Sequence, residues 1–408
     1  MHDKTRPAAQ MKLRRHQRAQ KVPGLKIVFS EIEFANGVLS IPFHEETRTD
    51  SLTFTLPQDW VLDTDLVALA LTTLLGTKYS TVVFSDAISP ETRGAVESVT
   101  QAEWVTGAAR SPVSDSPPQR NDLALNFSGG FDSLAAQALL PRDAHLISLD
   151  FGGPFARERE FFKDFPTHTI STNFRELGFS LNTWSFMGVG SILLRDYLNL
   201  QTYSFGAILE ASPWHFNAGM TSGNLRQAWF NQAGLTIFNP VIGLTEVGTA
   251  MIILSHRPEL ALRSLASVAG AGSLKHTRKL LLLHAAARHA PGPISLDPVN
   301  VEQPPLGVFG TNLANDFLSF YLYRVLGPEY TTLLVGDIPA DVLNRIRPLS
   351  LDFYEKINTN FYSGVSPSLA AHALHEAAVS QCVPYTYTDW QEFLEVKNIL
   401  AQFHEFPA

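Results

Sequence analysis

The sequence feature that most constrains the fold is a double-glycine turn between an apolar run and a helix-like run. Residues 123–127 read Leu-Ala-Leu-Asn-Phe, residues 128–133 read Ser-Gly-Gly-Phe-Asp-Ser, and the residues up to 140 are rich in Ala and Leu. We expect a strand, a tight turn and a helix in that order. Because the first amides of a helix lack intrahelical acceptors and carry the positive end of its dipole, this segment predicts an anion site sized for phosphate.

The segments around this turn predict an α/β fold. Further strand-like runs lie at 144–150, 168–172 and 204–209, while helix-like runs begin near 133 and 157 and cover 189–198. Regular alternation of this kind is typical of a parallel sheet covered by helices on both faces. By pattern and composition the chain divides into a basic flexible tail (1–26), an α+β accessory domain (27–106), a Pro- and Ser-rich linker (107–121), the α/β domain (122–300) and a helical C-terminal region (301–408).

The six residues of the turn resemble the PP-loop of the N-type ATP pyrophosphatases. The Gly-x-x-x-x-Gly-Lys-Ser/Thr sequence of Walker-type nucleotide-binding proteins is absent. The resemblance is closest to 7-cyano-7-deazaguanine synthase and spans residues 122–290, where Leu149-Asp150-Phe151-Gly152 and Arg157-Glu158 follow the second strand. It implies a sheet of the adenine nucleotide alpha hydrolase (HUP) type, ATP and Mg²⁺ as cofactors, and AMP-forming ligase activity.

In the chemistry that this resemblance implies, ATP adenylates an oxygen of a carboxylate or carbonyl substrate and pyrophosphate leaves. A nitrogen nucleophile then displaces AMP. The expected ATP-binding residues of the turn are Ser128, Gly129, Gly130, Phe131, Asp132 and Ser133. Since a carboxylate beside phosphates needs a bridging cation, Asp132 is also the expected Mg²⁺ ligand.

Outside the turn, the resemblance adds Asp150 and Arg157 as nucleotide-contacting residues. We expect Asp132 and Ser133 to act in catalysis with Lys275 and Arg278, which would stabilise negative charge on the leaving pyrophosphate. A solvated basic helix face is the alternative for these two cations.

A further group of candidates follows the strand predicted at 204–209. Glu210, Trp214 and His215 stand where α/β sheets place ligands, and ordinary loop packing is the alternative.

The chain departs from its nearest resemblance at two places. Its single cysteine, Cys382, cannot supply a four-cysteine zinc cluster, so we expect no zinc, and we expect this cysteine to be a small buried residue. Glu246 and Gly248 stand where the resembling family has Lys and Glu. The ATP half of the reaction is therefore supported by residues, whereas the acceptor is not.

The charge and hydropathy of the chain limit the partners that we expect it to bind. The net charge is −8, but residues 1–26 hold eight basic residues against one acidic residue, so the tail is +7 and the remainder −15. An acidic body argues against nucleic acid as the main partner, and no apolar run is long enough to span a membrane. We expect a cytoplasmic protein, with a homodimer left open. Two other functions stay open: a tRNA- or nucleic-acid-modifying PP-loop enzyme and a non-catalytic nucleotide-binding protein.

Overall fold

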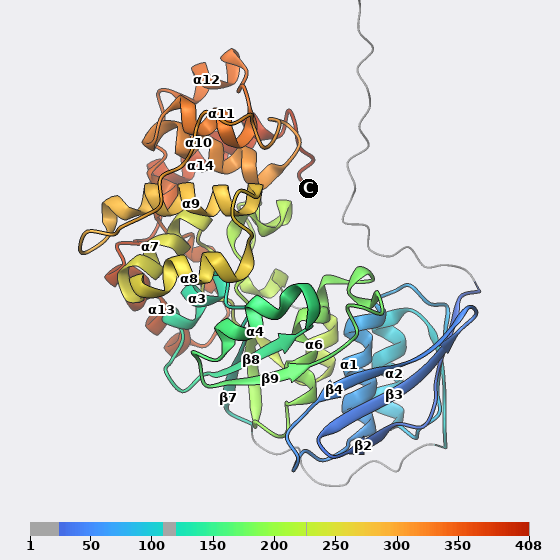
Figure 1. Cartoon of the computed structure of the whole chain (residues 1–408). Coiled ribbons are helices and arrows are strands. Elements are labelled where there is room, and N and C mark those ends of the chain that lie inside the picture. The colour runs from blue at the N-terminus through green and yellow to red at the C-terminus, as the bar shows by residue number, and fades with distance from the viewer. Residues whose placement is uncertain (1–23, 109–119, 226, 408) are drawn as a thin grey trace, which may run out of the picture.

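The computed structural model describes residues 24–108, 120–225 and 227–407, and two β-sheets organise them (Figure 1). Most of the predicted flexible tail and most of the predicted linker lie outside these residues. Among the residues described, no helix is long and apolar enough to cross a membrane.

The first sheet is built from residues 26–106 and combines antiparallel and parallel pairing. Its strands run in the order β2-β3-β1-β5-β6, with β4 paired to β3. Their bounds are β1 Lys26–Phe29, β2 Glu33–Ala35, β3 Val38–Glu45, β4 Arg48–Thr55, β5 Thr81–Phe84 and β6 Glu103–Thr106. Two helices complete the unit, α1 (Thr64–Leu75), capped by the Asp63 side chain, and α2 (Pro90–Thr100), capped by Ser89. Residues 26–106 therefore contain both strands and helices around one mixed sheet.

The second sheet is entirely parallel, as the strand and helix alternation predicts. Its strands are β7 (Asp122–Asn126), β8 (His145–Asp150), β9 (Thr167–Ser171), β10 (Leu200–Ser204) and β11 (Thr236–Ile237), in the order β11-β10-β7-β8-β9. The chain therefore starts at the centre, builds outward to β9, and crosses back to add β10 on the other side of β7. In open sheets of this kind, ligands bind beyond the carboxyl ends of the two strands where the direction reverses, here β7 and β10.

Helices cover both faces of the parallel sheet. One apolar cluster joins the β7 side chains Leu123 and Leu125 to the helices of one face, and another joins Ala124 and β8 Ile147 to the opposite face. The helices on the first side are α3 (Phe131–Leu139), α4 (Ala156–Phe162), α7 (Glu246–His256), α8 (Pro258–Val268) and α9 (Leu274–Ala286). On the second side, α5 (Val189–Leu193) and α6 (Ala228–Gln232) pack against α1 and α2. The predicted α/β class is thus confirmed.

The two sheets meet edge to edge between β4 and β9. Phe54 and Thr172 form an isolated antiparallel bridge, and the Asn173 side chain accepts from Thr53 N at 2.9 Å and donates to Ser51 O at 2.8 Å. The apolar cluster of the first unit continues under this junction to the second face of the parallel sheet. Residues 27–106 therefore share a hydrophobic core with the α/β domain.

The remaining helices form the C-terminal region, which lies on the α7 and α9 side in Figure 1. They are α10 (Leu313–Val325), α11 (Pro328–Val335), α12 (Ala340–Ile346), α13 (Pro367–Val379) and α14 (Tyr387–Leu400). Their apolar side chains belong to the same cluster as those of α3 and α7, so this region supports the helices behind the glycine turn.

Two predicted elements differ from the structure. The strand expected at 204–209 is β10, which ends at Ser204, and the helix expected at 189–198 ends at Leu193. The physical reason for the first is the close approach of Gly206 to α3: a Cβ at Gly206 would lie 2.7 Å from Asp132 C and from Ser133 N. The chain leaves the sheet at that point to pack against the start of α3.

Candidate functional site

The glycine turn lies between the carboxyl end of β7 and the first residue of α3. Gly129 has φ +72°, and a Cβ there would lie 2.6 Å from Phe161 Cδ1, so only glycine fits without strain. The Gly129 carbonyl accepts a hydrogen bond from Ser264 Oγ of α8 at 2.7 Å. Both glycine conformation and packing therefore fix the turn.

The N-terminus of α3 has no side-chain cap, because its N-cap residue is Gly130. By contrast, Thr245 caps α7 and Ser273 caps α9. Within the described residues, the N–H groups at the start of α3 thus receive no cap from an N-cap side chain, and they lie at the edge of the parallel sheet where strand order reverses. This end of α3 has the properties of an anion site.

The two serines of the turn contact each other. Ser128 Oγ and Ser133 Oγ are 3.2 Å apart, and Ser133 Oγ donates to Gly130 O at 3.0 Å. Ser128 is half-buried and Ser133 is buried, while the Phe131 ring is fully buried. The hydroxyl of Ser128 is therefore the more accessible of the two, and Phe131 contributes its backbone rather than its ring.

Asp132 points away from the turn toward α7 and α9. Its Oδ1 accepts from Thr249 Oγ1 at 3.1 Å and from Lys279 Nζ at 3.3 Å, and Lys279 Nζ is 3.5 Å from Oδ2. The Lys279 side chain is only 4 % exposed, and its ammonium lies over the Phe131 ring at 5.0 Å. The carboxylate that we expected to hold Mg²⁺ is thus paired with a buried lysine.

This pair belongs to a larger, partly buried ionic network. Lys279 Nζ also lies 3.6 Å from Glu246 Oε1, which accepts from Arg278 Nη2 at 2.9 Å. Arg278 Nη1 in turn donates to Asn315 Oδ1 of α10 at 3.0 Å. The guanidinium of Arg278, a candidate for contact with phosphate, therefore connects α9 to α7 and to the C-terminal region.

Glu210 completes the network. Its segment follows β10, and its Oε1 accepts from the backbone N–H of Glu246 at 2.7 Å. Burial first, and then repulsion from Glu246, raise the pKa of Glu210 to about 8, so this group is protonated at neutral pH. With Glu210 neutral, the carboxylates of Asp132 and Glu246 are balanced by Lys279 and Arg278. Although burial alone opposes it, the attraction of Asp132 and Glu246 raises the pKa of Lys279, so its ammonium keeps its charge.

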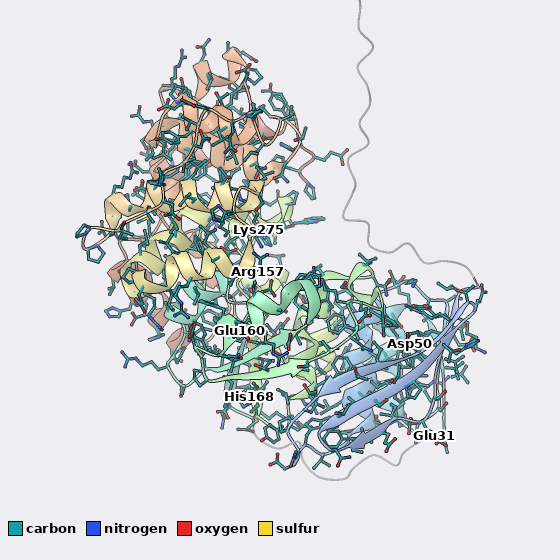
Figure 2. The ribbon with its side chains drawn as sticks, in the orientation of Figure 1. Glu31, Asp50, Arg157, Glu160, His168 and Lys275 are labelled. Carbon is teal, nitrogen blue, oxygen red and sulfur yellow. The ribbon has the colours of Figure 1, made fainter. Side chains whose placement is uncertain are left out.

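Two other cations lie on α4 and α9, the helices whose Phe161 and Lys279 contact the turn. Arg157, in the first turn of α4, and Lys275, in the first turn of α9, are labelled beside each other in Figure 2. Arg157 Nη1 approaches the loop before α9, 3.9 Å from a Cβ placed on Gly270. Neither side chain makes a salt bridge or hydrogen bond with another residue in the part of the chain that the structure describes. Burial first, and then the neighbouring Lys279, lower the pKa of Lys275, while the acids Glu158 and Asp132 oppose that shift.

A small cavity adjoins the turn at the carboxyl ends of β7 and β8. Its volume is about 20 Å³, room for about one water molecule, and its walls include Phe127, Ser128, Phe151, Glu158 and Met187. Burial raises the pKa of Glu158, against the attraction of Lys275 and Arg175. The cavity is mainly apolar and has one ionisable side chain at its edge.

Other candidates have structural contacts. Asp150 is buried, where Oδ1 accepts from Gly152 N at 2.9 Å and Oδ2 from Ser171 Oγ at 3.2 Å, so its carboxylate holds the turn after β8. His215 is buried with Nδ1 3.0 Å from Ile208 O, and burial lowers its pKa, whereas Trp214 is 53 % exposed. Asp150 and His215 therefore have backbone partners of their own.

The structure brings the turn, Arg157 and Lys275 to one edge of the sheet. Arg278 is instead bonded to Glu246 and Asn315, and Asp150 accepts from the turn after β8. The sequence also offers Lys279, in the same predicted helix turn as Lys275 and Arg278, as a cation that could neutralise charge on phosphate. Sequence reasoning missed that Lys279 pairs with Asp132 instead, and it missed Thr249 beside the same carboxylate.

Comparison with known proteins adds no relative. No family model, curated protein or solved structure matches this chain. Among the residues described, no group of three or more His, Cys, Asp or Glu side chains is arranged to hold a metal ion.

Proposed function

We propose that this protein is an ATP-dependent, AMP-forming ligase whose glycine turn binds the phosphates of ATP. The single observation that carries the proposal is the uncapped N-terminus of α3 at the point where the strand order of the parallel sheet reverses. The sequence resemblance of the turn to PP-loops supports the same ligand. On this proposal the parallel sheet is of the HUP type.

The residues of the turn fit a polyphosphate. Gly129 lets the backbone approach the ligand, and the N–H groups of Phe131, Asp132 and Ser133 are available to donate to phosphate oxygens. Ser128 Oγ adds a hydroxyl donor, and Arg157 on α4 and Lys275 on α9 add positive charge on the neighbouring helices.

In the proposed reaction the protein acts mainly by positioning the reactants and by stabilising charge. An oxygen of the carboxylate or carbonyl substrate forms a bond to the α-phosphorus of ATP, and the bond to pyrophosphate breaks. A nitrogen nucleophile such as ammonia then attacks the activated carbon, loses a proton, and displaces AMP. The turn amides and Lys275 would stabilise the negative charge on the departing pyrophosphate.

Mg²⁺ is the expected partner of ATP in such chemistry, but Asp132 fits a direct contact with it poorly. Thr249 and the ammonium of Lys279 already engage the carboxylate, and Mg²⁺ in proteins usually needs one or two free carboxylates besides the phosphates. We therefore assign no step to a metal bound at Asp132.

The test is pyrophosphate release measured across small carboxylic acids, peptides and deazapurines, with ATP and ammonia present. Release should fall at least about 100-fold in Ser133→Ala, which disturbs the turn, because misplaced reacting groups cost about that factor. The matched control is Ser368→Ala, an exposed serine in the first turn of α13. Equal release by both variants would reject the assignment of the site.

A non-catalytic nucleotide-binding protein is the second candidate. The pairing of Asp132 with Lys279 favours it, because it removes the free acid expected at a metal-assisted site. Tight ATP binding without pyrophosphate release under any substrate mixture would support this function. The nucleic-acid-modifying alternative depends on the basic tail, most of which lies outside the described residues.

A further inference from the structure

We infer that the glycine turn binds the pyrophosphate group of its ligand without a bridging divalent cation, because Lys279 supplies a fixed positive charge at Asp132. This inference rests on the proposed function and concerns what its site requires. The carrying observation is the contact of a lysine with the one carboxylate of the turn.

An acidic side chain close to a phosphate normally needs a cation beside it. Two negative groups a few ångströms apart repel strongly where water is partly excluded, and a metal ion or a basic side chain must offset that repulsion. Here Lys279 Nζ lies 3.3 Å from Asp132 Oδ1 and 3.5 Å from Oδ2. The charge of Asp132 is therefore already offset within the protein.

Lys279 is fixed in its position beside Asp132. Its side chain is 4 % exposed, and its other acidic contact is Glu246, whose Oε1 also accepts from Arg278 at 2.9 Å. An ammonium that moved to solvent would leave the Asp132 carboxylate without this cationic partner. Lys279 thus behaves as a permanent part of the turn.

The net charge of the groups around the turn determines which ligand the turn suits. With Asp132 and Glu246 balanced by Lys279 and Arg278, the network adds no net negative charge behind the turn when Glu210 is protonated. Arg157 on α4 and Lys275 on α9 are then free of salt bridges among the described residues. The ligand class that suits this arrangement is a metal-free diphosphate or triphosphate.

The experiment is calorimetric titration of the full chain with inorganic pyrophosphate, once with EDTA and once with excess Mg²⁺. The wild-type dissociation constant with EDTA should lie within about threefold of that with Mg²⁺, since a difference of 1.4 kcal/mol would already be tenfold. Binding only with Mg²⁺ overturns this inference and leaves the proposed function standing. No binding under either condition overturns both.

Variants test the role of Lys279 directly. Lys279→Met leaves the Asp132 charge exposed to the ligand, so affinity with EDTA should fall at least about tenfold and recover with Mg²⁺. The double variant Lys279→Met/Asp132→Asn removes both charges and should bind with EDTA within about threefold of wild type. Failure of the double variant to recover contradicts the inference. If the single variant does not fold, wild type and the double variant decide the question.

Discussion

Glu210 Oε1 accepts a hydrogen bond from the backbone N–H of Glu246 at 2.7 Å, so a buried acid from the segment after β10 holds the first turn of α7. The same α7 carries Thr249, which donates to Asp132 in the glycine turn at 3.1 Å. Glu210, which follows β10, is therefore linked through α7 to Asp132, which follows β7. Its Oε2 and the Oε2 of Glu246 are buried without hydrogen-bond partners among the described residues. Such atoms are costly when ionised.

Glu210 gives the protein a pH dependence of stability with a definite sign. Its pKa is raised in the folded state, so the folded protein holds a proton that the unfolded chain loses. The contribution is fully present below the ordinary pKa of 4.5 and is lost as pH rises through about 8. Between pH 7 and pH 9, wild type should therefore lose about 1 kcal/mol of unfolding free energy through this group.

The measurement is urea unfolding of wild type and Glu210→Gln at both pH values. Glutamine mimics the protonated acid, so the variant should lack this loss and exceed wild type in stability at pH 9. Glu302→Gln, at an exposed position, is the control and should follow wild type. Parallel pH curves for wild type and Glu210→Gln would show that Glu210 is ionised in the folded state.

Gly129 and Gly94 form a matched pair of glycine positions. Gly129→Ala should lower the unfolding free energy by at least about 2 kcal/mol, since Ala resists φ +72° and its Cβ meets Phe161 at 2.6 Å. Gly94 is exposed inside α2 with open space around it, so Gly94→Ala should stabilise by up to about 1 kcal/mol. Chemical denaturation measures both. A neutral Gly129→Ala would mean that the turn adopts another conformation.

Asn173 should contribute much of the stability of the junction between the two sheets. Its side chain makes two hydrogen bonds to the β4 backbone, at Thr53 N and Ser51 O. Asn173→Ala leaves these groups without their partner and should cost about 1–3 kcal/mol of unfolding free energy. Amide hydrogen exchange should quicken at Thr53, while Asn344→Ala, on an exposed face of α12, should change neither quantity. Unchanged exchange at Thr53 would assign the junction to packing alone.

Cys382 should be inert in the folded protein. It is 1 % exposed, its Sγ donates weakly to Gly248 O at 3.8 Å, and burial raises its pKa to about 12. Ellman's reagent should therefore react only after unfolding in guanidinium, and one thiol per chain should then appear, because the sequence holds a single cysteine. Rapid labelling of the native protein would contradict the packing of the C-terminal region against α7.

Local sequence patterns predicted much of the fold. The strand, glycine turn and helix around Ser128 follow from residues that are neighbours in the chain. The predicted strand at 204–209 was misplaced, because the residues after Ser204 are as apolar as a strand while their path depends on the contact of Gly206 with α3. Periodicity carries no information about such contacts.

The sequence by itself determined that a double-glycine turn would join a strand to a helix and leave backbone amides available for an anion. Backbone conformation depends mainly on residues close in the chain. Only the tertiary structure decided that Lys279, 147 residues from Asp132, would neutralise that acid, and that Asp150 would hold the turn after β8. Such pairings arise when helices pack, and a buried charge takes the partner that packing brings within reach.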